Sequence, residues 1–163
     1  MDAIEAIKTR RSVRAYTKQP VSRDVLLDLV DCARMAPSAM NQQVWEFLII
    51  TSKETMKRLG ELIPNSAWLA NAPAGIAVII RPVSFYVEDG AAATLSLMLA
   101  ARAHGLGSCW VSGDKQPYAE VVKRALGAPD PYKFMSLVAV GYAAEEAGKE
   151  KRPLDSLVHW EKF

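Results

Sequence analysis

With 163 residues, of which 50% are hydrophobic and 23% are charged, the chain is long enough for one domain, residues 1–163, with a substantial core. Its formal net charge of +2 is too mild for a nucleic-acid-binding protein, and its two cysteines and two histidines disfavour a disulfide framework, a metal site or a catalytic triad. No apolar run is long enough to cross a membrane, and acidic residues stand where a secretory signal would carry bases, so we expect a cytoplasmic protein with neither nucleic acid nor membrane as partner.

The first half of the chain alternates helix and strand signals. In chain order these predict a short helix before Arg10, a helix from Ser22 to about Ala36, a strand over Val44–Ile50, a helix after Thr51 and Glu54 that ends at Pro64, and a helical turn through Trp68 and Leu69. The start of the helix that ends at Pro64 is predicted from the capping-box spacing of Thr51 and Glu54. Pro37 and Pro64 end their helices because proline cannot continue the backbone hydrogen bonds.

The middle of the chain carries the two most apolar elements. Gly75–Ile80 is continuously apolar, which predicts a strand buried on both faces. From about Phe85 to His104 runs a helix with many alanines and almost no polar face, so it must be covered nearly all round. A domain of this size can hardly bury such a helix from every side, and we therefore favour a subunit interface over a central core helix. Gly105 is suited to cap its end.

The last third is predicted to contain two more strands, Cys109–Val111 and Phe134–Val140, and between them a helix that starts at Pro117 and stops at Gly127. The tail then becomes charged but ends with apolar residues, which we expect to pack on another surface, a second subunit being one candidate: Leu154, Leu157, Val158, Trp160 and Phe163. Helices and strands mix without a regular βαβ alternation, so the predicted class is α+β.

Three arginines and a serine fall within the five residues Arg10-Arg11-Ser12-Val13-Arg14. Guanidinium groups match phosphate oxygens two at a time, and a serine hydroxyl can bind a remaining oxygen. The same stretch could equally form a solvated basic turn, so these residues alone leave both interpretations open.

A second polar cluster lies in the loop before the first predicted strand. Ser38, Asn41 and Gln43 could bind the edge of a planar heterocycle, because amides both donate and accept hydrogen bonds. The commoner use of such residues is to end a helix and turn the chain. The chain has no dinucleotide fingerprint, Walker loop, Gly-x-Ser-x-Gly elbow or His-Glu-x-x-His motif, which disfavours Rossmann, kinase and hydrolase chemistry.

Four motifs, in order along nearly the whole chain, resemble the nitroreductase family. They are Arg-Arg-Ser-x-Arg-x-Tyr from Arg10, Ala-Pro-Ser-x-x-Asn-x-Gln-x-Trp-x-Phe from Ala36, the alanine-rich helix that ends in His104-Gly105-Leu106-Gly107-Ser108-Cys109-Trp110, and Val140-Gly141-Tyr142 followed by a Lys/Arg-Pro-Leu segment. The resemblance implies a mostly antiparallel central sheet flanked by helices, in an intertwined homodimer, with FMN as the cofactor.

The flavin contacts of that family carry over to matching residues. The N-terminal motif, which grips the phosphate and ribityl chain of FMN, corresponds to Arg10, Arg11, Ser12 and Arg14. The loop that reaches the flavin from the neighbouring subunit corresponds to Pro37, Ser38, Ala39, Asn41 and Gln43. The turn beside the isoalloxazine ring corresponds to Leu106, Gly107 and Ser108. Late basic residues complete the phosphate grip, and here Lys151 and Arg152 are preferred over Lys149.

The resemblance implies an NAD(P)H-dependent oxidoreductase that reduces a nitroaromatic, a quinone or a similar oxidised small molecule with ping-pong kinetics. No catalytic side chain is then required, because the flavin carries the chemistry. Two alternatives remain: a binding module that holds FMN or another phosphorylated ligand without turnover, and a specialised flavin enzyme of the dehalogenase or flavin-degrading type. These motifs identify neither the physiological acceptor nor a preference between NADH and NADPH.

Overall fold

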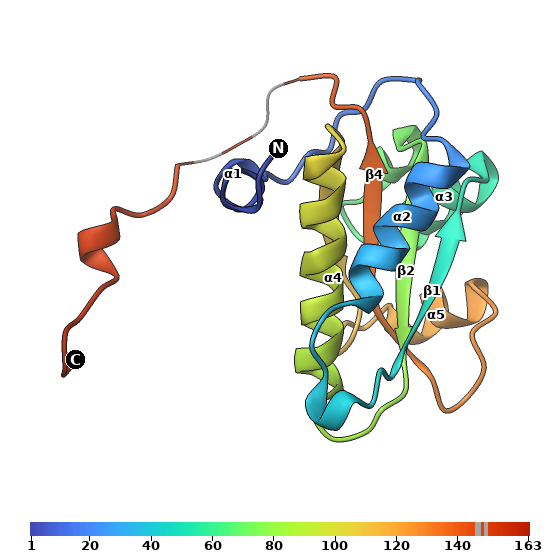
Figure 1. Ribbon diagram of the computed structural model, residues 1–163. Coiled ribbons are helices and arrows are strands. Elements are labelled where there is room, and N and C mark those ends of the chain that lie inside the picture. Colours follow the sequence, from blue (N-terminus) through green and yellow to red (C-terminus); the bar gives the residue numbers. More distant parts are fainter. Residues whose placement is uncertain (146–147, 149) are drawn as a thin grey trace.

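A four-stranded antiparallel sheet lies between two layers of helices in the computed structural model, which describes residues 1–145, 148 and 150–163 (Figure 1). The strands are β1 (Trp45–Ile50), β2 (Ala74–Ile80), β3 (Gly107–Ser112) and β4 (Lys133–Gly141), and their order in the sheet is β1-β2-β4-β3. The predicted α+β class with an antiparallel central sheet is confirmed.

The two central strands are apolar along most of their length. Every residue of β2 is buried, which confirms the strand predicted at Gly75–Ile80. β3 starts two residues before the predicted Cys109, because Gly107 and Ser108 already pair with the last residues of β4. β1 and β3 form the two edges of the sheet.

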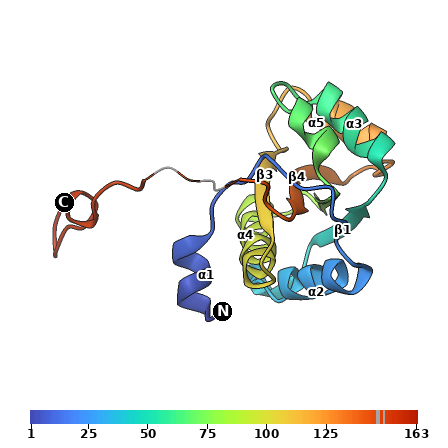
Figure 2. The same cartoon turned by 90° about the horizontal axis from the view of Figure 1, so that it is seen from above.

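Helices cover both faces of the sheet, as Figure 2 shows from above. On one face lie α2 (Arg23–Arg34) and α4 (Tyr86–Ala103). On the other lie α3 (Lys53–Leu62), the 3₁₀ turn η2 (Ala67–Asn71) and α5 (Ala119–Ala125). Ser22 caps α2 as predicted, and its Oγ accepts a hydrogen bond from the Val25 N–H at 3.3 Å.

Two helix starts differ from the prediction. Ser52, and not Thr51, caps α3, and its Oγ accepts a hydrogen bond from the Thr55 N–H at 3.2 Å. The cap therefore lies one residue later than the capping-box spacing indicated. α5 starts at Ala119 and not at Pro117, because turns precede it. Both shifts change the first turn only, and the apolar faces of the two helices still point to the sheet.

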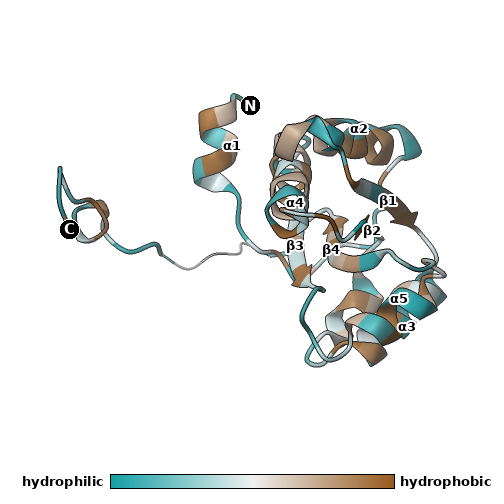
Figure 3. Cartoon of the chain, turned by 90° about the horizontal axis from the view of Figure 1, so that it is seen from below, coloured by the Kyte–Doolittle hydropathy of each residue, from teal (hydrophilic) through white to brown (hydrophobic). Residues whose placement is uncertain are grey.

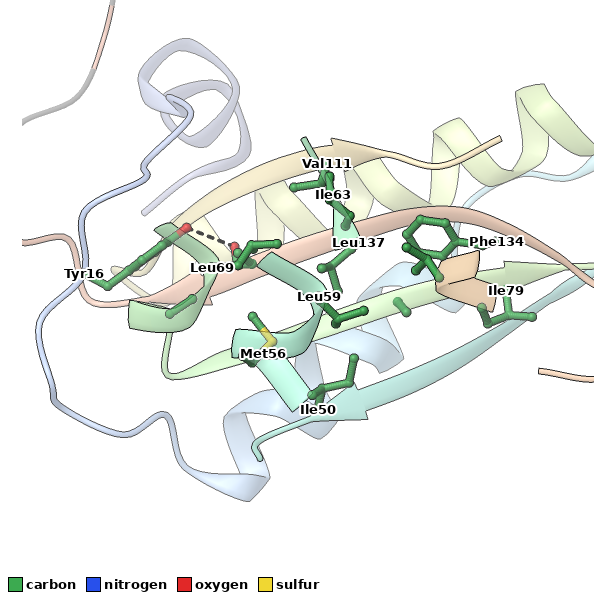
Figure 4. Packing of buried hydrophobic residues seen from close by; sticks show 14 of the residues in the cluster. Tyr16, Ile50, Met56, Leu59, Ile63, Leu69, Ile79, Val111, Phe134 and Leu137 are labelled. Carbon is green, nitrogen blue, oxygen red and sulfur yellow. Dashed lines mark hydrogen bonds between the residues drawn. The ribbon is translucent and has the colours of Figure 1, made fainter. Parts of the chain in front are cut away.

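Buried apolar side chains hold these layers together. Between the sheet and α3, η2 and α5, they include Leu59, Leu69 and Phe134 (Figure 4). Tyr16 joins this cluster from the N-terminal segment, and its hydroxyl donates a hydrogen bond to the Val13 carbonyl at 2.6 Å. The core therefore fixes the segment that carries the basic motif.

Within a single chain, helix α4 is left uncovered along one stripe. Its inner side packs on α2 and the sheet, where Ala93, Leu97 and Ala101 are fully buried. On its outer side Leu95 is 46% exposed and Leu99 is only half-buried. One chain does not provide the nearly complete cover that this apolar helix was predicted to have.

The two chain ends differ in how they meet the body. Helix α1 (Ala3–Thr9) lies beside α4, whereas residues 150–163 lie away from the body, and the apolar residues of this tail are brown in Figure 3. This tail contains the 3₁₀ turn η3 (Leu154–Ser156), and Trp160 is 84% exposed. The apolar tail that we expected to pack on another surface is exposed in the part of the chain that the structure describes. Among the described helices, none combines the length and the apolar character that a membrane crossing requires.

Candidate functional site

The basic motif lies across the end of the sheet at which β3 begins and β4 ends. Ser12 forms an isolated parallel bridge with Ser108, and the Val13 N–H donates to the Ser108 carbonyl at 2.9 Å. Four residues later, Tyr16 forms an antiparallel bridge with Ala143. The motif is therefore held at the sheet by backbone pairing on both sides of Arg14, and is not a free surface turn.

A cleft of about 550 Å³ opens beside this segment. It brings together the predicted Arg10, Arg11, Leu106, Gly107 and Ser108. Its other lining residues are Thr9, Val13, Arg102, Gly105, Ala143, Ala144 and Glu145. Residues from α1, the end of α4, the start of β3 and the end of β4 thus meet in one hollow, which chain order alone does not reveal.

Three guanidinium groups line the cleft, and they differ in how free they are. Arg11 Nη1 donates to the carbonyls of Lys8 and Arg10, at 2.8 and 2.9 Å. Arg102 Nε donates to Thr9 Oγ1 at 2.9 Å, which fixes its direction while its two terminal nitrogens remain for a ligand. Such pre-oriented, permanently charged donors suit a phosphate or another anion.

Gly107 lets the basic segment approach the sheet. A Cβ at this position would lie 2.8 Å from both Cβ and Cγ2 of Val13, which is closer than real side chains come. Because Gly107 has no side chain, it leaves room for Val13 and adds no bulk to the wall of the cleft. Packing against Val13 therefore favours a glycine at this position.

Ser12 is exposed, and Ser108, with which it forms a backbone bridge, directly precedes Cys109. Burial raises the pKa of the Cys109 thiol, although the Arg14 guanidinium, the hydrogen bond with Ser12 and the Arg10 guanidinium all oppose this rise. The thiol is therefore neutral at pH 7 and behaves as a small buried apolar group.

Arg14 does not line this cleft. Its guanidinium lies over the ring of Trp68, 6.0 Å from the ring centroid, on the side of the sheet that carries η2. The basic motif therefore divides: Arg10 and Arg11 face the cleft, and Arg14 lines a second hollow together with Lys18 and Lys53.

The predicted loop residues Pro37, Ser38, Ala39, Asn41 and Gln43 lie around the 3₁₀ turn η1 (Ala39–Asn41), at the opposite end of α4 from the cleft. Asp89, in the first turn of α4, is only 4% exposed, and its Oδ1 accepts a hydrogen bond from the Ala39 N–H at 2.9 Å. Asp89 and Arg102 are 13 positions apart on one helix, or about 20 Å at 1.5 Å per residue. Within one chain, the loop and the cleft are therefore separate.

This loop is held in a strained conformation. Met40, Asn41 and Gln43 all have positive φ angles, of 51°, 53° and 48°. The Gln43 N–H donates to Ser38 Oγ at 3.0 Å, which closes the turn. Left-handed conformations at non-glycine residues persist only where the surroundings enforce them, and they concentrate at functional sites.

Lys151 and Arg152 lie in the tail and are not among the described residues that line the cleft. Arg152 Nη2 donates to the Ser156 carbonyl at 2.8 Å, within the tail itself. Lys149, the less favoured alternative, lies outside the described residues.

The sequence reasoning missed Arg102, the third arginine of the cleft. One signal could have found it, because it is the single charged residue between Asp89 and His104 in an otherwise apolar helix. A charge that interrupts such a pattern near a helix end marks a polar neighbour, here Thr9. Thr9, Gly105, Ala143, Ala144 and Glu145 carry no comparable signal.

Comparison with known proteins identifies the arrangement. The model of the nitroreductase family matches residues 7–82 and 65–142. The chain belongs to the nitroreductase family. Among relatives of this nitroreductase-family chain, a Methanothermobacter thermautotrophicus protein named as a candidate NADH dehydrogenase/NAD(P)H nitroreductase is 30% identical over 169 residues, covering 100% of this chain and 88% of its own. An Archaeoglobus fulgidus protein of the same name is 32% identical over 152 residues, covering 89% and 87%.

Solved structures extend the match to the three-dimensional fold. A Parabacteroides distasonis protein named as a candidate NADH dehydrogenase/NAD(P)H nitroreductase superposes with a TM-score of 0.93 at 27% identity, covering 99% of this chain and 98% of its own. An FMN-dependent nitroreductase from Clostridium difficile gives a TM-score of 0.91, also at 27% identity, over 98% and 99%. The nitroreductase fold therefore accounts for nearly the whole chain.

Proposed function

We propose that the protein is an FMN-dependent oxidoreductase that takes hydride from NAD(P)H and delivers it to an oxidised small molecule such as a nitroaromatic or a quinone. The observation that carries this proposal is the cleft lined by Arg10, Arg11 and Arg102 at the end of the sheet. The C. difficile neighbour, named as FMN-dependent, supports a flavin as its ligand. Bound FMN supplies the hydride-transfer chemistry, and the protein needs to bind it, orient it and admit the substrates.

The residues of the cleft fit FMN. A phosphate monoester carries close to two negative charges at neutral pH, which three guanidinium groups can neutralise through short, strong hydrogen bonds. The volume of about 550 Å³ lies within the roughly 300–1,000 Å³ of cofactor pockets. Leu106, Gly107 and Ser108 form a wall of little bulk for the ring, and we assign Lys151 and Arg152 to the phosphate as additional donors from the tail.

The flavin site is proposed to be shared between two copies of the chain. The loop around Asn41 and Gln43 lies about 20 Å from the cleft along α4, so one chain cannot offer both to one cofactor. If two chains pack with their α4 helices antiparallel, the loop of each chain meets the cleft of the other. A two-fold dimer then contains two equivalent sites.

Surface apolar residues support the same dimer. The outer side of α4 presents Leu95 and Leu99, with Ala92 and Ala103 on the same stripe at spacings of three and four residues. Burial of such a stripe against its copy removes apolar surface from water, and the small alanines allow the backbones to approach closely. The exposed tail would add a second contact, through residues such as Trp160.

The donor and the acceptor are proposed to occupy the same place in turn. We assign the cleft residues to binding and assign no catalytic side chain, because hydride transfer from the bound flavin requires no proton donor of this chain. NAD(P)H would bind, transfer hydride and leave before the acceptor enters, which is ping-pong behaviour.

Steady-state kinetics test this proposal. Oxidation of NADH and NADPH by the FMN-supplemented protein is followed at several concentrations of a quinone such as menadione. We expect turnover that depends on FMN, and parallel lines in double-reciprocal plots. Tight FMN binding without turnover with quinone or nitroaromatic acceptors would favour a binding module, and intersecting lines would contradict the ping-pong order.

Subunit complementation tests the shared site. Arg10→Ala disables the cleft, and Asn41→Ala with Gln43→Ala disables the loop, so each variant alone should bind FMN weakly. In a heterodimer of the two variants, one site has both parts intact and the other has both disabled. We expect one FMN per heterodimer at wild-type affinity. A site made by one chain would instead give weak binding at both positions.

A further inference from the structure

Among the residues that the structure describes, a second hollow on the molecule is lined by four cations and by no carboxylate. It has a volume of about 740 Å³ and lies on the other side of the basic segment from the arginine cleft. Its cations are Arg14, Lys18, Lys53 and Lys57. The whole chain has 20 lysines and arginines against 18 acids, so four unopposed cations in one hollow are a marked local excess.

Within the described part of the chain, none of these four cations forms an ion pair with an acidic side chain. Lys53 and Lys57 are one turn apart on α3 and therefore point to the same side of that helix. The acid next to them in sequence, Glu54, lines a different hollow together with Arg58, and Lys57 borders both hollows.

The backbone of α3 adds to the positive potential. This ten-residue helix begins at Lys53, and Thr51 and Lys53 both line the hollow, so the amino end of the helix faces it. The first amides of a helix have no partner within it. Ser52 Oγ already accepts a hydrogen bond from the Thr55 amide, and the remaining first amides attract anions together with the helix dipole. Four side-chain cations and a helix amino terminus thus act on the same space.

The floor of the hollow is formed by Tyr16 and the segment that follows η2. The Tyr16 hydroxyl is already used in hydrogen bonds to the carbonyls of Val13 and Ala139, at 2.6 and 3.3 Å. Ala72 and Pro73 contribute apolar surface beside it. A ligand would therefore meet cations at the rim and a mostly apolar, uncharged floor, which suits a phosphorylated molecule with a flat organic part.

We propose that this hollow is a second anion site, which binds the phosphate or pyrophosphate group of a phosphorylated small molecule through Arg14, Lys18, Lys53 and Lys57. The source that we favour is the NADPH donor, and this assignment of the source rests on the proposed function. The segment that carries Arg14 separates this hollow from the arginine cleft, so the two sites are distinct and can be filled together.

Calorimetric titration tests the site without requiring turnover. Inorganic pyrophosphate is titrated into the FMN-supplemented protein, into Lys53→Gln with Lys57→Gln, and into a control with the same charge change, Lys115→Gln with Arg124→Gln, whose residues lie outside both hollows. We expect saturable binding that is weakened about tenfold or more in the first pair and unchanged in the control. FMN affinity should be unchanged in all three proteins.

Three results would overturn the proposal. One is the absence of saturable pyrophosphate binding, and another is an equal loss in the control pair, which would indicate only a general charge effect. The third is a loss of FMN affinity on changing Lys53 and Lys57, which would make this hollow part of the flavin site. Because pyrophosphate binding is measured directly, an absence of NAD(P)H oxidation would count against the proposed function only.

The kinetic constants then distinguish the source of the phosphate. If the 2′-phosphate of NADPH is the bound group, Lys53→Gln with Lys57→Gln should raise KM for NADPH about tenfold and leave KM for NADH nearly unchanged. If the bound group is the pyrophosphate that both donors carry, both KM values should rise alike. If both KM values stay the same while pyrophosphate binding is lost, the site takes a separate phosphorylated ligand. All three outcomes support the anion site.

Discussion

Gly107→Ala tests whether the basic segment must lie against the sheet for the cleft to bind its ligand. The new Cβ would lie 2.8 Å from two carbons of Val13 and 2.9 Å from a third. Val13 is buried and branched at Cβ, so it cannot turn away, and the segment from Arg10 to Arg14 must shift. The shift would stretch the hydrogen bond from the Val13 N–H to the Ser108 carbonyl, now 2.9 Å.

The expected size of the effect follows from these contacts. Overpacking of a buried contact costs about 1–3 kcal/mol, and weakening one backbone hydrogen bond costs about 1 kcal/mol more. We therefore expect the free energy of unfolding in urea to fall by about 2–4 kcal/mol. FMN affinity, measured by fluorescence titration, should fall between about tenfold and a hundredfold, because Arg10 and Arg11 move with the segment.

Gly127→Ala is the matched control. Gly127, unlike Gly107, has a positive φ, 72°, but a Cβ there meets no atom within 4 Å, and it lies at the end of α5, away from the cleft. It should lose about 1 kcal/mol of stability through backbone strain and keep its FMN affinity. Adding Val13→Ala to Gly107→Ala removes two of the three close contacts and should recover part of the lost affinity. Wild-type FMN affinity in Gly107→Ala would refute the reasoning.

Three further predictions concern the cleft, the core and the loop. Arg10→Ala should weaken FMN binding more than Arg11→Ala in fluorescence titrations, with far-UV circular dichroism unchanged, because Arg11 already donates to two backbone carbonyls; the reverse order would contradict the proposed roles. Burial raises the pKa of Tyr16 above its usual range, so above about pH 10 only the unfolded state readily ionises this phenol. Stability measured by urea unfolding should fall by up to about 1.4 kcal/mol per pH unit on this account, and Tyr16→Phe should remove that contribution to the slope. Asp89→Ala should cost about 1–3 kcal/mol in the same assay, because the Ala39 N–H loses its acceptor; an unchanged midpoint would show that the loop does not depend on this contact.

Local signals predicted most of the fold. The cap of α2 at Ser22 and the buried strand β2 are confirmed. Capping and complete burial each require particular residue types at fixed positions, so the sequence predicts both. The starts of α3 and α5 were misjudged by one and two residues. Several polar residues near a helix start can each cap it, and only packing on the sheet decides among them.

The site was predicted less completely, for reasons of distance along the chain. Arg102 joins the cleft through Thr9, 93 positions earlier, and no local pattern specifies that pairing. Arg14 belongs to the same short motif as Arg10. It nevertheless lies over Trp68, because the segment moves away from β3 after the bridge between Ser12 and Ser108. The apolar composition of α4, by contrast, predicts that this helix needs cover from a second subunit. The exposed Leu95 agrees with that prediction.

The most direct test of the central claim is an anaerobic absorption spectrum of the protein after FMN has been added and free ligand has been removed by gel filtration, recorded before and after addition of NADH or NADPH. The account predicts that flavin absorption co-elutes with the protein and bleaches with at least one of the two donors. Protein that elutes without flavin, or flavin that neither donor bleaches, would contradict it.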